Sequence, residues 1–308
     1  MSPGRSGEPG PGAPQDHGDP AVSPPVREAC ELLDRRRAGA YHTLTLVAPR
    51  IAAAARPGQF VEVLAGRDRS FLLRRPFSIH RVERPGLALG AIQIVLDVVG
   101  PGTRALAGLR PHEVLDVLGP LGRPFALPQE PAPCLLVGGG YGAAPLFFLA
   151  EQLRARRCRV DFLVGAATAA RLLRTMEAKR LGHSLTVTTD DGSAGRRGLV
   201  TGAMPAVLAH ARTEVVYACG PMPMLAAVAR VAAGRGLPCQ VAVEERMACG
   251  TGICFSCVVP LRDAGGAPGR MARSCLEGPV FDAAAVAWDE LGLAAGEAAD
   301  AELRELTP

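Results

Sequence analysis

Four cysteines near the end of the chain have the spacing of ligands to an iron–sulfur cluster. Three lie in the segment Met-Ala-Cys-Gly-Thr-Gly-Ile-Cys-Phe-Ser-Cys and the fourth follows after a longer gap: Cys249, Cys254, Cys257 and Cys275. The pattern C-x4-C-x2-C with a distant fourth cysteine is typical of plant-type [2Fe-2S] sites. Gly250 and Gly252 give the loop the backbone freedom to wrap around a cluster. We therefore expect the four cysteines to be metal ligands.

A zinc site and disulfide bonds are the alternatives for these cysteines. Structural zinc sites usually pair their ligands as two C-x2-C units, whereas here the first gap is four residues and the fourth cysteine stands alone. Disulfide bonds would need an oxidising compartment, and the sequence shows no export signal. The spacing therefore favours an iron–sulfur cluster, and we expect a reducing, cytoplasmic location.

The composition argues against a membrane protein and against a nucleic-acid-binding protein. Although 48% of the 308 residues are hydrophobic, no apolar run approaches the roughly 20 residues that span a bilayer. The formal net charge is +4, and the arginines are scattered rather than gathered beside aromatic residues. A chain of this length is expected to hold two or three domains.

The chain divides into five segments, which predict a multidomain protein. Residues 1–25 are rich in Pro, Gly and Ser and should form a disordered tail. Residues 26–130 contain short apolar runs broken by Gly and Pro, which predict a small β-barrel. Strand-like and helix-like runs alternate over residues 131–238 and predict an α/β domain with a parallel sheet. Residues 239–290 should form a small cluster domain, and residues 291–308 a tail.

Individual elements are expected within the two larger segments. In the barrel the strands are predicted at Tyr41–Val47, Gln59–Leu64, Phe77–Val82, Leu89–Val99 and Glu113–Leu118. In the α/β segment they are predicted at Cys134–Val137, Val160–Val164, Leu185–Thr189 and Val215–Ala218, with helices at Ala144–Arg157 and Ala169–Lys179. Ala206–Ala211 and Pro223–Ala233 continue this alternation.

A glycine-rich segment lies where the first α/β strand is predicted to end and a helix to begin. Its sequence, Gly-Gly-Gly-Tyr-Gly-Ala-Ala-Pro over residues 138–145, fits G-x-G-x-x-G/A through Gly138, Gly140 and Ala143. Such a turn lets backbone N–H groups and a helix N-terminus face a pyrophosphate. Tight packing of strand against helix could require the same residues, so the turn alone favours a nucleotide only slightly.

Two further turns are predicted at the same edge of the sheet. Cys219-Gly-Pro-Met follows the strand Val215–Ala218, and Thr-Asp-Asp-Gly-Ser over residues 189–193 follows the strand Leu185–Thr189. Open parallel sheets bind ligands at the carboxyl ends of their strands. Asp190 could bond ribose hydroxyls there, although capping a turn is the more common role of Asp-Gly. One nucleotide that touches three loops explains all three turns.

The first half of the chain contains two further candidates for phosphate binding. Leu-Arg-Arg-Pro-Phe-Ser-Ile over residues 73–79 places paired cations beside an extended segment that could meet a flat ring. A basic solvent-facing strand explains the same residues equally well. Val98–Thr103 offers a second glycine turn that ends in a hydroxyl. No Ser-His-Asp arrangement or carboxylate pair stands out, so the chemistry should come from cofactors and we assign no catalytic residue.

In this order the motifs resemble the ferredoxin–NADP reductase superfamily, which joins a flavin-binding barrel to a nicotinamide-binding α/β domain. With the C-terminal cysteines, the chain resembles the electron-transfer subunits of the bacterial NAD-dependent dihydroorotate dehydrogenase, from about Val26 to Leu291. The stretches that carry the resemblance are residues 74–79, 137–146, 217–221, 244–257 and 275–282.

The resemblance implies which residues hold each cofactor. FAD would be lined by Arg75, Pro76, Phe77 and Ser78, would run along Val95, Leu96 and Asp97, and would have a phosphate held by Gly102 and Thr103. NAD would be received by Gly138, Gly139, Gly140, Gly142, Ala143, Asp190, Cys219, Gly220 and Pro221. Asp97 stands where related subunits commonly carry a basic residue, and Arg123-Pro124 replaces the usual Asn-Gly.

The resemblance also implies a partner and a direction of electron flow. The partner would be an FMN-containing dihydroorotate dehydrogenase catalytic subunit, in a heterotetramer of two of each chain. In pyrimidine (UMP) biosynthesis the partner oxidises dihydroorotate to orotate, and electrons pass from FMN through the cluster and FAD to NAD.

Two other functions are kept as alternatives. The first is a subunit of an NAD(P)H-dependent ferredoxin, sulfide or hydrogenase-type reductase, in which Arg171 or Arg174 could accept a 2′-phosphate. The second is a non-catalytic metal module beside a nucleotide-sensing domain, which would be colourless and loaded with zinc.

Overall fold

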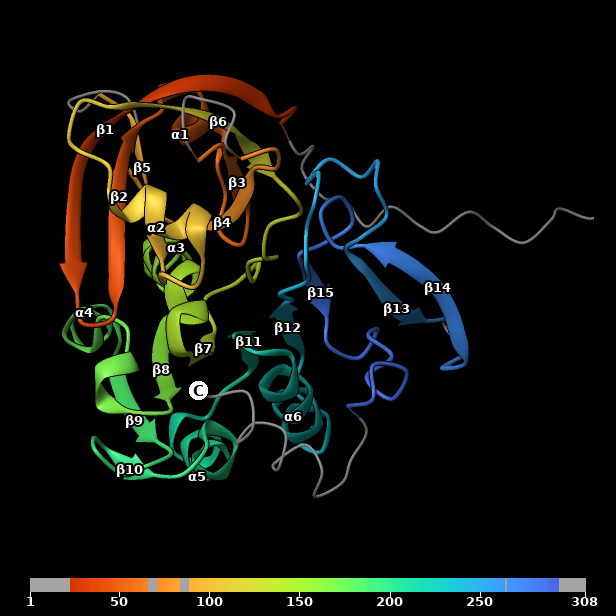
Figure 1. Cartoon of the computed structure of the whole chain (residues 1–308). Coiled ribbons are helices and arrows are strands. Elements are labelled where there is room, and N and C mark those ends of the chain that lie inside the picture. The colour runs from red at the N-terminus through yellow and green to blue at the C-terminus, as the bar shows by residue number, and fades with distance from the viewer. Residues whose placement is uncertain (1–22, 66–70, 84–88, 264, 294–308) are drawn as a thin grey trace, which may run out of the picture.

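The computed structural model describes residues 23–65, 71–83, 89–263 and 265–293. Figure 1 shows a barrel formed by the first part of the chain, an α/β layer below it, and a smaller C-terminal hairpin at the side. This arrangement confirms the predicted fold class. Most of the predicted terminal tails, residues 1–25 and 291–308, lies outside the described residues.

The barrel is closed by six antiparallel strands in the order β1-β2-β5-β4-β3-β6. They are β1 (Val26–Ala38), β2 (Tyr41–Val47), β3 (Phe60–Val63), β4 (Arg75–Glu83), β5 (Ala91–Leu96) and β6 (Val114–Leu121), with short helices α1 (Pro49–Ala54) and α2 (Pro101–Ala107) between them. Alternating side chains such as Leu44, Leu46, Ile92 and Ile94 are fully buried inside it. The barrel therefore has a core of its own.

The α/β layer contains a seven-stranded sheet in the order β10-β9-β8-β7-β11-β12-β15. Its strands are β7 (Pro133–Gly139), β8 (Arg159–Ala166), β9 (Ser184–Thr189), β10 (Arg196–Arg197), β11 (Val215–Cys219), β12 (Cys239–Ala242) and β15 (Val280–Asp282). All neighbouring pairs are parallel except β12 with β15. The strand order reverses between β7 and β11, which is where open sheets of this kind bind their ligands.

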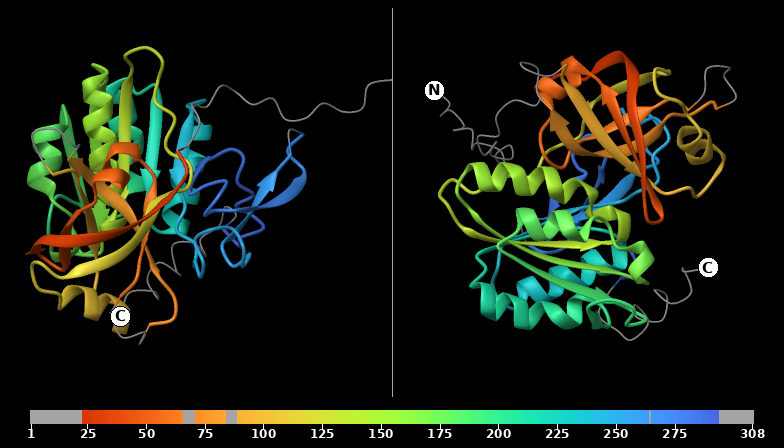
Figure 2. Two further views of the ribbon diagram at one scale, coloured as in Figure 1. Left: turned by 90° about the horizontal axis from the view of Figure 1, so that it is seen from above. Right: turned by 90° about the vertical axis from the view of Figure 1, so that its left-hand side faces the viewer.

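Helices cover both faces of this sheet. They are α3 (Ala144–Ala155), α4 (Thr175–Leu181), α5 (Val200–Ala211) and α6 (Met222–Ala233), with 3-10 turns η1 (Gly140–Ala143) and η2 (Ala169–Arg171). Along β7, Leu136 packs in the core with α3, whereas Leu135 and Val137 pack in the core with α5 and α6. In the right-hand view of Figure 2, α3 lies between the sheet and the barrel.

The cysteine segment is anchored to the sheet rather than separate from it. Strands β12 and β15 lie in this segment, and between them β13 (Val258–Arg262) and β14 (Pro268–Arg273) form an antiparallel hairpin. The edge of the sheet therefore continues directly into the cysteine loop.

Two expectations about elements were wrong. The sequence pattern missed β1, which pairs with both β2 and β6. The helix expected at Ala169–Lys179 is broken into η2 and α4, because Leu172 has an extended backbone and Arg174 a left-handed one with φ of 45°. Among the described residues, no helix is long and apolar enough to cross a membrane.

Polar contacts fix the barrel on the α/β layer. His80 Nδ1 lies 2.7 Å from the carbonyl oxygen of Ala144 at the start of α3, and Arg81 pairs with Glu151 of α3 at 2.7 Å. The His80 ring also meets Phe147 edge-on, with 5.0 Å between ring centroids. Helix α3 therefore sets the position of the barrel relative to the sheet.

We expect Leu149→Ala to lower the free energy of unfolding of the apoprotein by about 2–5 kcal/mol, because it leaves a cavity under α3. Leu149 is fully buried, whereas Leu72 is 94% exposed. Leu72→Ala is the matched control and should change stability by less than about 0.5 kcal/mol. Urea denaturation followed by circular dichroism measures both, and equal effects would contradict the packing described for α3.

Candidate functional site

Two cavities adjoin at the edge of the sheet where the strand order reverses. The first, which we call the edge cavity, has a volume of about 260 Å³ and lies across the carboxyl ends of β7, β8 and β9 and the starts of α5 and α6. The second, the barrel cavity, has a volume of about 150 Å³ and lies between β4, β5 and the start of α3. Two side chains, Tyr141 and Glu244, line both.

The glycine turn and the Cys219-Gly-Pro turn are in direct contact, as predicted for one shared edge. A Cβ atom added to Gly142 would come 2.7 Å from the Cα atom of Gly220, and one added to Gly138 would come 2.6 Å from the Cβ atom of Ala143. Side chains at Gly138 and Gly142 are thus excluded by packing. The structure supports both readings of these glycines, because close packing brings the turns together and leaves bare backbone at the cavity.

The residues predicted to receive NAD fall into three groups. Gly139, Gly140, Asp190 and Pro221 line the edge cavity. Gly142 lines the barrel cavity. The remaining residues belong to the two turns but are buried and line neither cavity: Gly138, Ala143, Cys219 and Gly220.

The two neighbouring aspartates in the turn after β9 have different roles. Asp191 Oδ1 accepts hydrogen bonds from the backbone N–H of Ser193 at 2.9 Å and from its hydroxyl at 2.6 Å, so Asp191 caps the turn. Asp190 lines the edge cavity, and burial raises the pKa of its carboxyl group. Asp191 therefore has the capping role, and Asp190 lies where the predicted bond to ribose hydroxyls could form.

The residues predicted to hold FAD surround the barrel cavity and the turn beside it. Pro76, Phe77, Ser78 and Val95 line the barrel cavity. Arg75 lies over the start of α2. The two are in close contact, since a Cβ atom added to Gly102 would come 2.7 Å from Arg75 Nε.

The turn that leads into α2 is fixed by Thr103. Its Oγ1 accepts hydrogen bonds from the backbone N–H groups of Val99 at 3.0 Å and Gly100 at 3.1 Å. Leu96 is buried, and Asp97 forms an ion pair with Arg171 at 2.6 Å. The Arg75 side chain and the turn that leads into α2 thus meet beside the barrel cavity, as binding of a flavin pyrophosphate requires.

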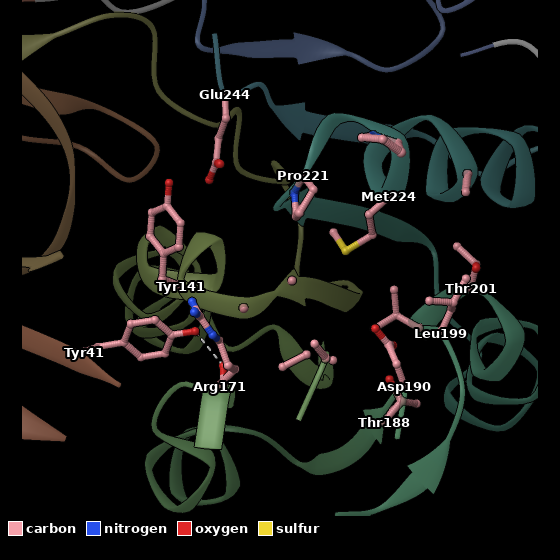
Figure 3. Close-up of a pocket in the computed structure, with 18 of the residues that line it drawn as sticks. Tyr41, Tyr141, Arg171, Thr188, Asp190, Leu199, Thr201, Pro221, Met224 and Glu244 are labelled. Carbon is pink, nitrogen blue, oxygen red and sulfur yellow. Dashed lines mark hydrogen bonds between the residues drawn. The ribbon is translucent and has the colours of Figure 1, made fainter. Parts of the chain in front are cut away.

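Tyr141 and Glu244 form the wall between the two cavities, and neither is among the site residues predicted from the sequence. The Tyr141 hydroxyl and the Glu244 carboxyl group point toward each other across the opening (Figure 3). The Glu244 side chain is exposed to the cavities, but the protein atoms around it desolvate its charged form and raise the pKa of its carboxyl group to about 7. Glu244 follows β12 closely, so the rule that ligands bind at the carboxyl ends of strands would have found it.

The four predicted cluster ligands lie together as two pairs, Cys249 beside Cys254 and Cys257 beside Cys275. The backbone N–H of Thr251 points at the Cys249 sulfur, 3.4 Å away. In the described part of the chain, no three His, Cys, Asp or Glu side chains converge as ligands of a single ion. Two thiol pairs fit a cluster of two irons, each of which takes two cysteines.

Positive φ angles at two glycines let the cysteine loop fold back on itself. Gly250 has φ of 66° and Gly252 has φ of 82°. A Cβ atom on Gly252 would come 2.1 Å from Leu276 Cδ1, and one on Gly250 would come 2.3 Å from Glu62 Oε1. Neither position can carry a side chain without displacing its neighbour.

We expect Glu244→Gln to stabilise the apoprotein by an amount that grows as the pH rises from about 4.5 to about 7 and is constant above that. Over this range the unfolded chain has lost the Glu244 proton while the folded chain still holds it, so native stability falls with pH. Glu214→Gln, which removes an exposed carboxylate, is the matched control. Urea denaturation at several pH values measures the difference, and a pH-independent difference would contradict the raised pKa.

Two family models match the chain. The iron–sulfur cluster binding domain of dihydroorotate dehydrogenase B matches residues 244–287, and an oxidoreductase NAD-binding domain matches residues 136–230. The first match contains all four cysteines, and the second contains the glycine turn and the Cys219-Gly-Pro turn.

Several curated relatives are electron transfer subunits of dihydroorotate dehydrogenase B (NAD(+)). The subunit of Desulforamulus reducens is 38% identical over 242 residues, which cover 79% of this chain and 90% of the relative. That of Geobacillus thermodenitrificans is 38% identical over 263 residues, which cover 84% and 98%.

Solved structures give the same fold. An NADH-dependent reduced ferredoxin-NADP oxidoreductase structure, described for flavin-based electron bifurcation, contains a chain that is 31% identical, with a TM-score of 0.73 over 94% of this chain and 98% of that chain. The ferredoxin reductase of carbazole 1,9a-dioxygenase is 22% identical with a TM-score of 0.60 over 71% of this chain and 68% of that chain, which supports the fold alone.

The motif-based resemblance is thereby confirmed over most of the chain. With two curated relatives at 38% identity that are matched over nine-tenths or more of their length, the chain belongs to the family of electron transfer subunits of dihydroorotate dehydrogenase B.

Proposed function

We propose that this chain transfers electrons between NAD and the FMN-containing catalytic subunit of a dihydroorotate dehydrogenase, through FAD and a [2Fe-2S] cluster. The reaction serves pyrimidine biosynthesis, and dihydroorotate is oxidised on the partner rather than on this chain. The matches to the cluster-binding and NAD-binding family models support this assignment, as does the flavin-reductase fold.

One observation carries the proposal: a single short segment links the two cavities to the cysteines. Val243, Glu244, Glu245 and Met247 line the barrel cavity, Glu244 also lines the edge cavity, and Cys249 follows two residues after Met247. The segment therefore connects both cavities, which meet at Glu244, to the cysteine loop that begins a few residues later.

Hydrophobic packing also connects the barrel cavity to the second thiol pair, Cys257 and Cys275. Phe60 and Met247 line the barrel cavity and also pack in one cluster with Leu121, Cys257 and Cys275. Packed side chains therefore lie between the cavity wall and these two cysteines. This packing supports direct electron transfer between the two sites.

When bound, FAD would exchange a hydride with the nicotinamide and single electrons with a [2Fe-2S] cluster, which carries one electron at a time. The residues of this chain bind and orient these groups. Pro76, Phe77 and Ser78 provide the barrel wall for the flavin ring, and Arg75 the cation for its pyrophosphate. The backbone of the glycine turn faces the pyrophosphate of the dinucleotide, and Glu244 positions its nicotinamide on the other side of Tyr141 from the flavin.

We infer that the partner docks over the cysteine loop. Cys254 is exposed, and its neighbours Ile253 and Phe255 expose 79% and 61% of their surface. An apolar surface around an exposed ligand suits a partner that must approach closely. The family resemblance supports a heterotetramer of two of each subunit, and the free thiols suit a reducing cytoplasm.

A second candidate is a subunit of an NAD(P)H-dependent ferredoxin-type reductase. The match with the ferredoxin-NADP oxidoreductase structure, at 31% identity over nearly the whole chain, favours it. Co-purification distinguishes the two candidates. A copurifying FMN protein that reduces NAD+ with dihydroorotate supports the first, and dihydroorotate-independent reduction of ferredoxin supports the second.

We expect Cys254→Ala to abolish dihydroorotate-dependent NAD+ reduction by the complex, because the cluster loses one of its four thiolates. Flavin reduction by NADH should continue, since its binding residues are unchanged. NADH formation and flavin absorbance under anaerobic conditions measure the two activities. Cys158→Ala, which removes a thiol away from the cysteine loop, is the control and should retain both.

Equal loss of the two activities in Cys254→Ala, with flavin still bound, would contradict the relay. An iron-free and flavin-free wild-type protein after anaerobic purification would contradict the whole proposal. A zinc-loaded, colourless protein would instead favour a structural metal module.

A further inference from the structure

An ion pair connects the barrel to the α/β layer beside the edge cavity. Arg171 Nη1 donates to Asp97 Oδ2 at 2.6 Å, and the side chain of Asp97 is 13% exposed while that of Arg171 is 46% exposed. Asp97 directly follows β5 of the barrel, and Arg171 lies in η2 after β8. The pair is thus buried on the aspartate side and open on the arginine side.

A second contact holds the backbone of Arg171. The Tyr41 hydroxyl donates to the Arg171 carbonyl oxygen at 2.7 Å, which is drawn as a dashed line in Figure 3. Both Tyr41 and Arg171 line the edge cavity together with the glycine turn. Asp97 and Tyr41, both from the barrel, therefore fix the side chain and the main chain of Arg171 before any ligand binds. An arginine oriented in advance loses less conformational entropy on binding an anion.

The charges around the edge cavity are unequally placed. Among the described residues its charged lining consists of Arg171, Arg230, Asp190 and Glu244. Arg230 lies near the C-terminal end of α6, about two helical turns from the Cys219-Gly-Pro turn, and its Nη1 donates to the Leu293 carbonyl oxygen at 3.0 Å. Arg171 uses only Nη1 for Asp97, which leaves Nε–H and Nη2–H donors for a ligand. A dinucleotide brings two phosphate charges, and these need cationic donors close to the glycine turn.

We propose that Arg171, held by Asp97 and Tyr41, binds the pyrophosphate of the nicotinamide dinucleotide. This inference rests on the proposed function in one respect, the binding of NAD in the edge cavity. It accounts for an acidic residue at position 97, which orients a cation across the domain boundary. The proposal applies to Arg171 and not to Arg174, whose guanidinium already pairs with Glu177 at 2.9 Å and donates to Thr43 Oγ1 at 2.8 Å.

Because Arg171 would contact the pyrophosphate, which both dinucleotides contain, its loss should weaken the binding of NAD+ and of NADP+ by the same factor. We expect Arg171→Gln to raise the dissociation constant of each by about 10- to 100-fold, the effect of losing a charge-assisted hydrogen bond. Isothermal titration calorimetry on the oxidised, cofactor-loaded protein measures this without turnover. Arg154→Gln removes the same charge from the exposed C-terminal part of α3 and should leave both constants unchanged.

Arg171→Lys keeps the charge without the planar fork, so its dissociation constants should lie between those of the wild type and Arg171→Gln. Asp97→Asn removes the charge that orients Arg171, so it should raise both dissociation constants in the wild-type background and change them little in Arg171→Gln. An Asp97→Asn variant with wild-type affinity would overturn the role of Asp97.

Wild-type affinity in Arg171→Gln, or a loss confined to NADP+, would overturn the pyrophosphate assignment. A wild-type protein that binds neither dinucleotide would instead overturn the proposed function, so the two failures are distinct. Flavin and iron contents measured on each variant report whether it has folded.

Discussion

The close approach of the glycine turn and the Cys219-Gly-Pro turn is the constraint on which the site depends. Gly142 meets Gly220 so closely that neither turn can carry a side chain at the contact. This contact joins the ends of β7 and β11, the two strands between which the sheet reverses its order. The edge cavity opens on one side of the contact and the barrel cavity on the other. A bulkier residue in either turn would separate the strands and with them the two cavity walls.

The barrel contributes as much to the site as the sheet does. Its strand β4 lines the barrel cavity, while Tyr41 of β2 reaches the edge cavity. Asp97, just after β5, meets an arginine of the other layer. Neither layer holds a complete site alone, so the packing of α3 against β4 is a functional contact as well as a structural one.

Local patterns predicted the parts of the site that depend on neighbouring residues in the chain. The cysteine spacing and the glycine turn are such patterns, because a loop must wrap or a helix must begin within a few residues. Tyr141 and Glu244 could not be assigned in the same way, since their role arises only when β7 and β12 lie in one sheet. The strand β1 was missed because Glu28 and Asp34 occupy the same alternating positions as the buried Cys30 and Leu32, so the apolar half of its alternation is weak. The helix expected from residue 169 is interrupted between Leu172, which is extended, and Arg174, which is left-handed, and no composition rule anticipates either conformation.

The cysteine loop is tied to both larger parts of the molecule. The backbone N–H of Val243 donates to the Pro279 carbonyl oxygen at 2.9 Å, and that of Arg123, just beyond the barrel, donates to the Gly278 carbonyl oxygen at 2.5 Å. Pairing of β12 with β15 holds both ends of the cysteine loop in one sheet. Cofactors bound as proposed would therefore lie at a fixed spacing, and electron transfer between them would need no movement of the loop.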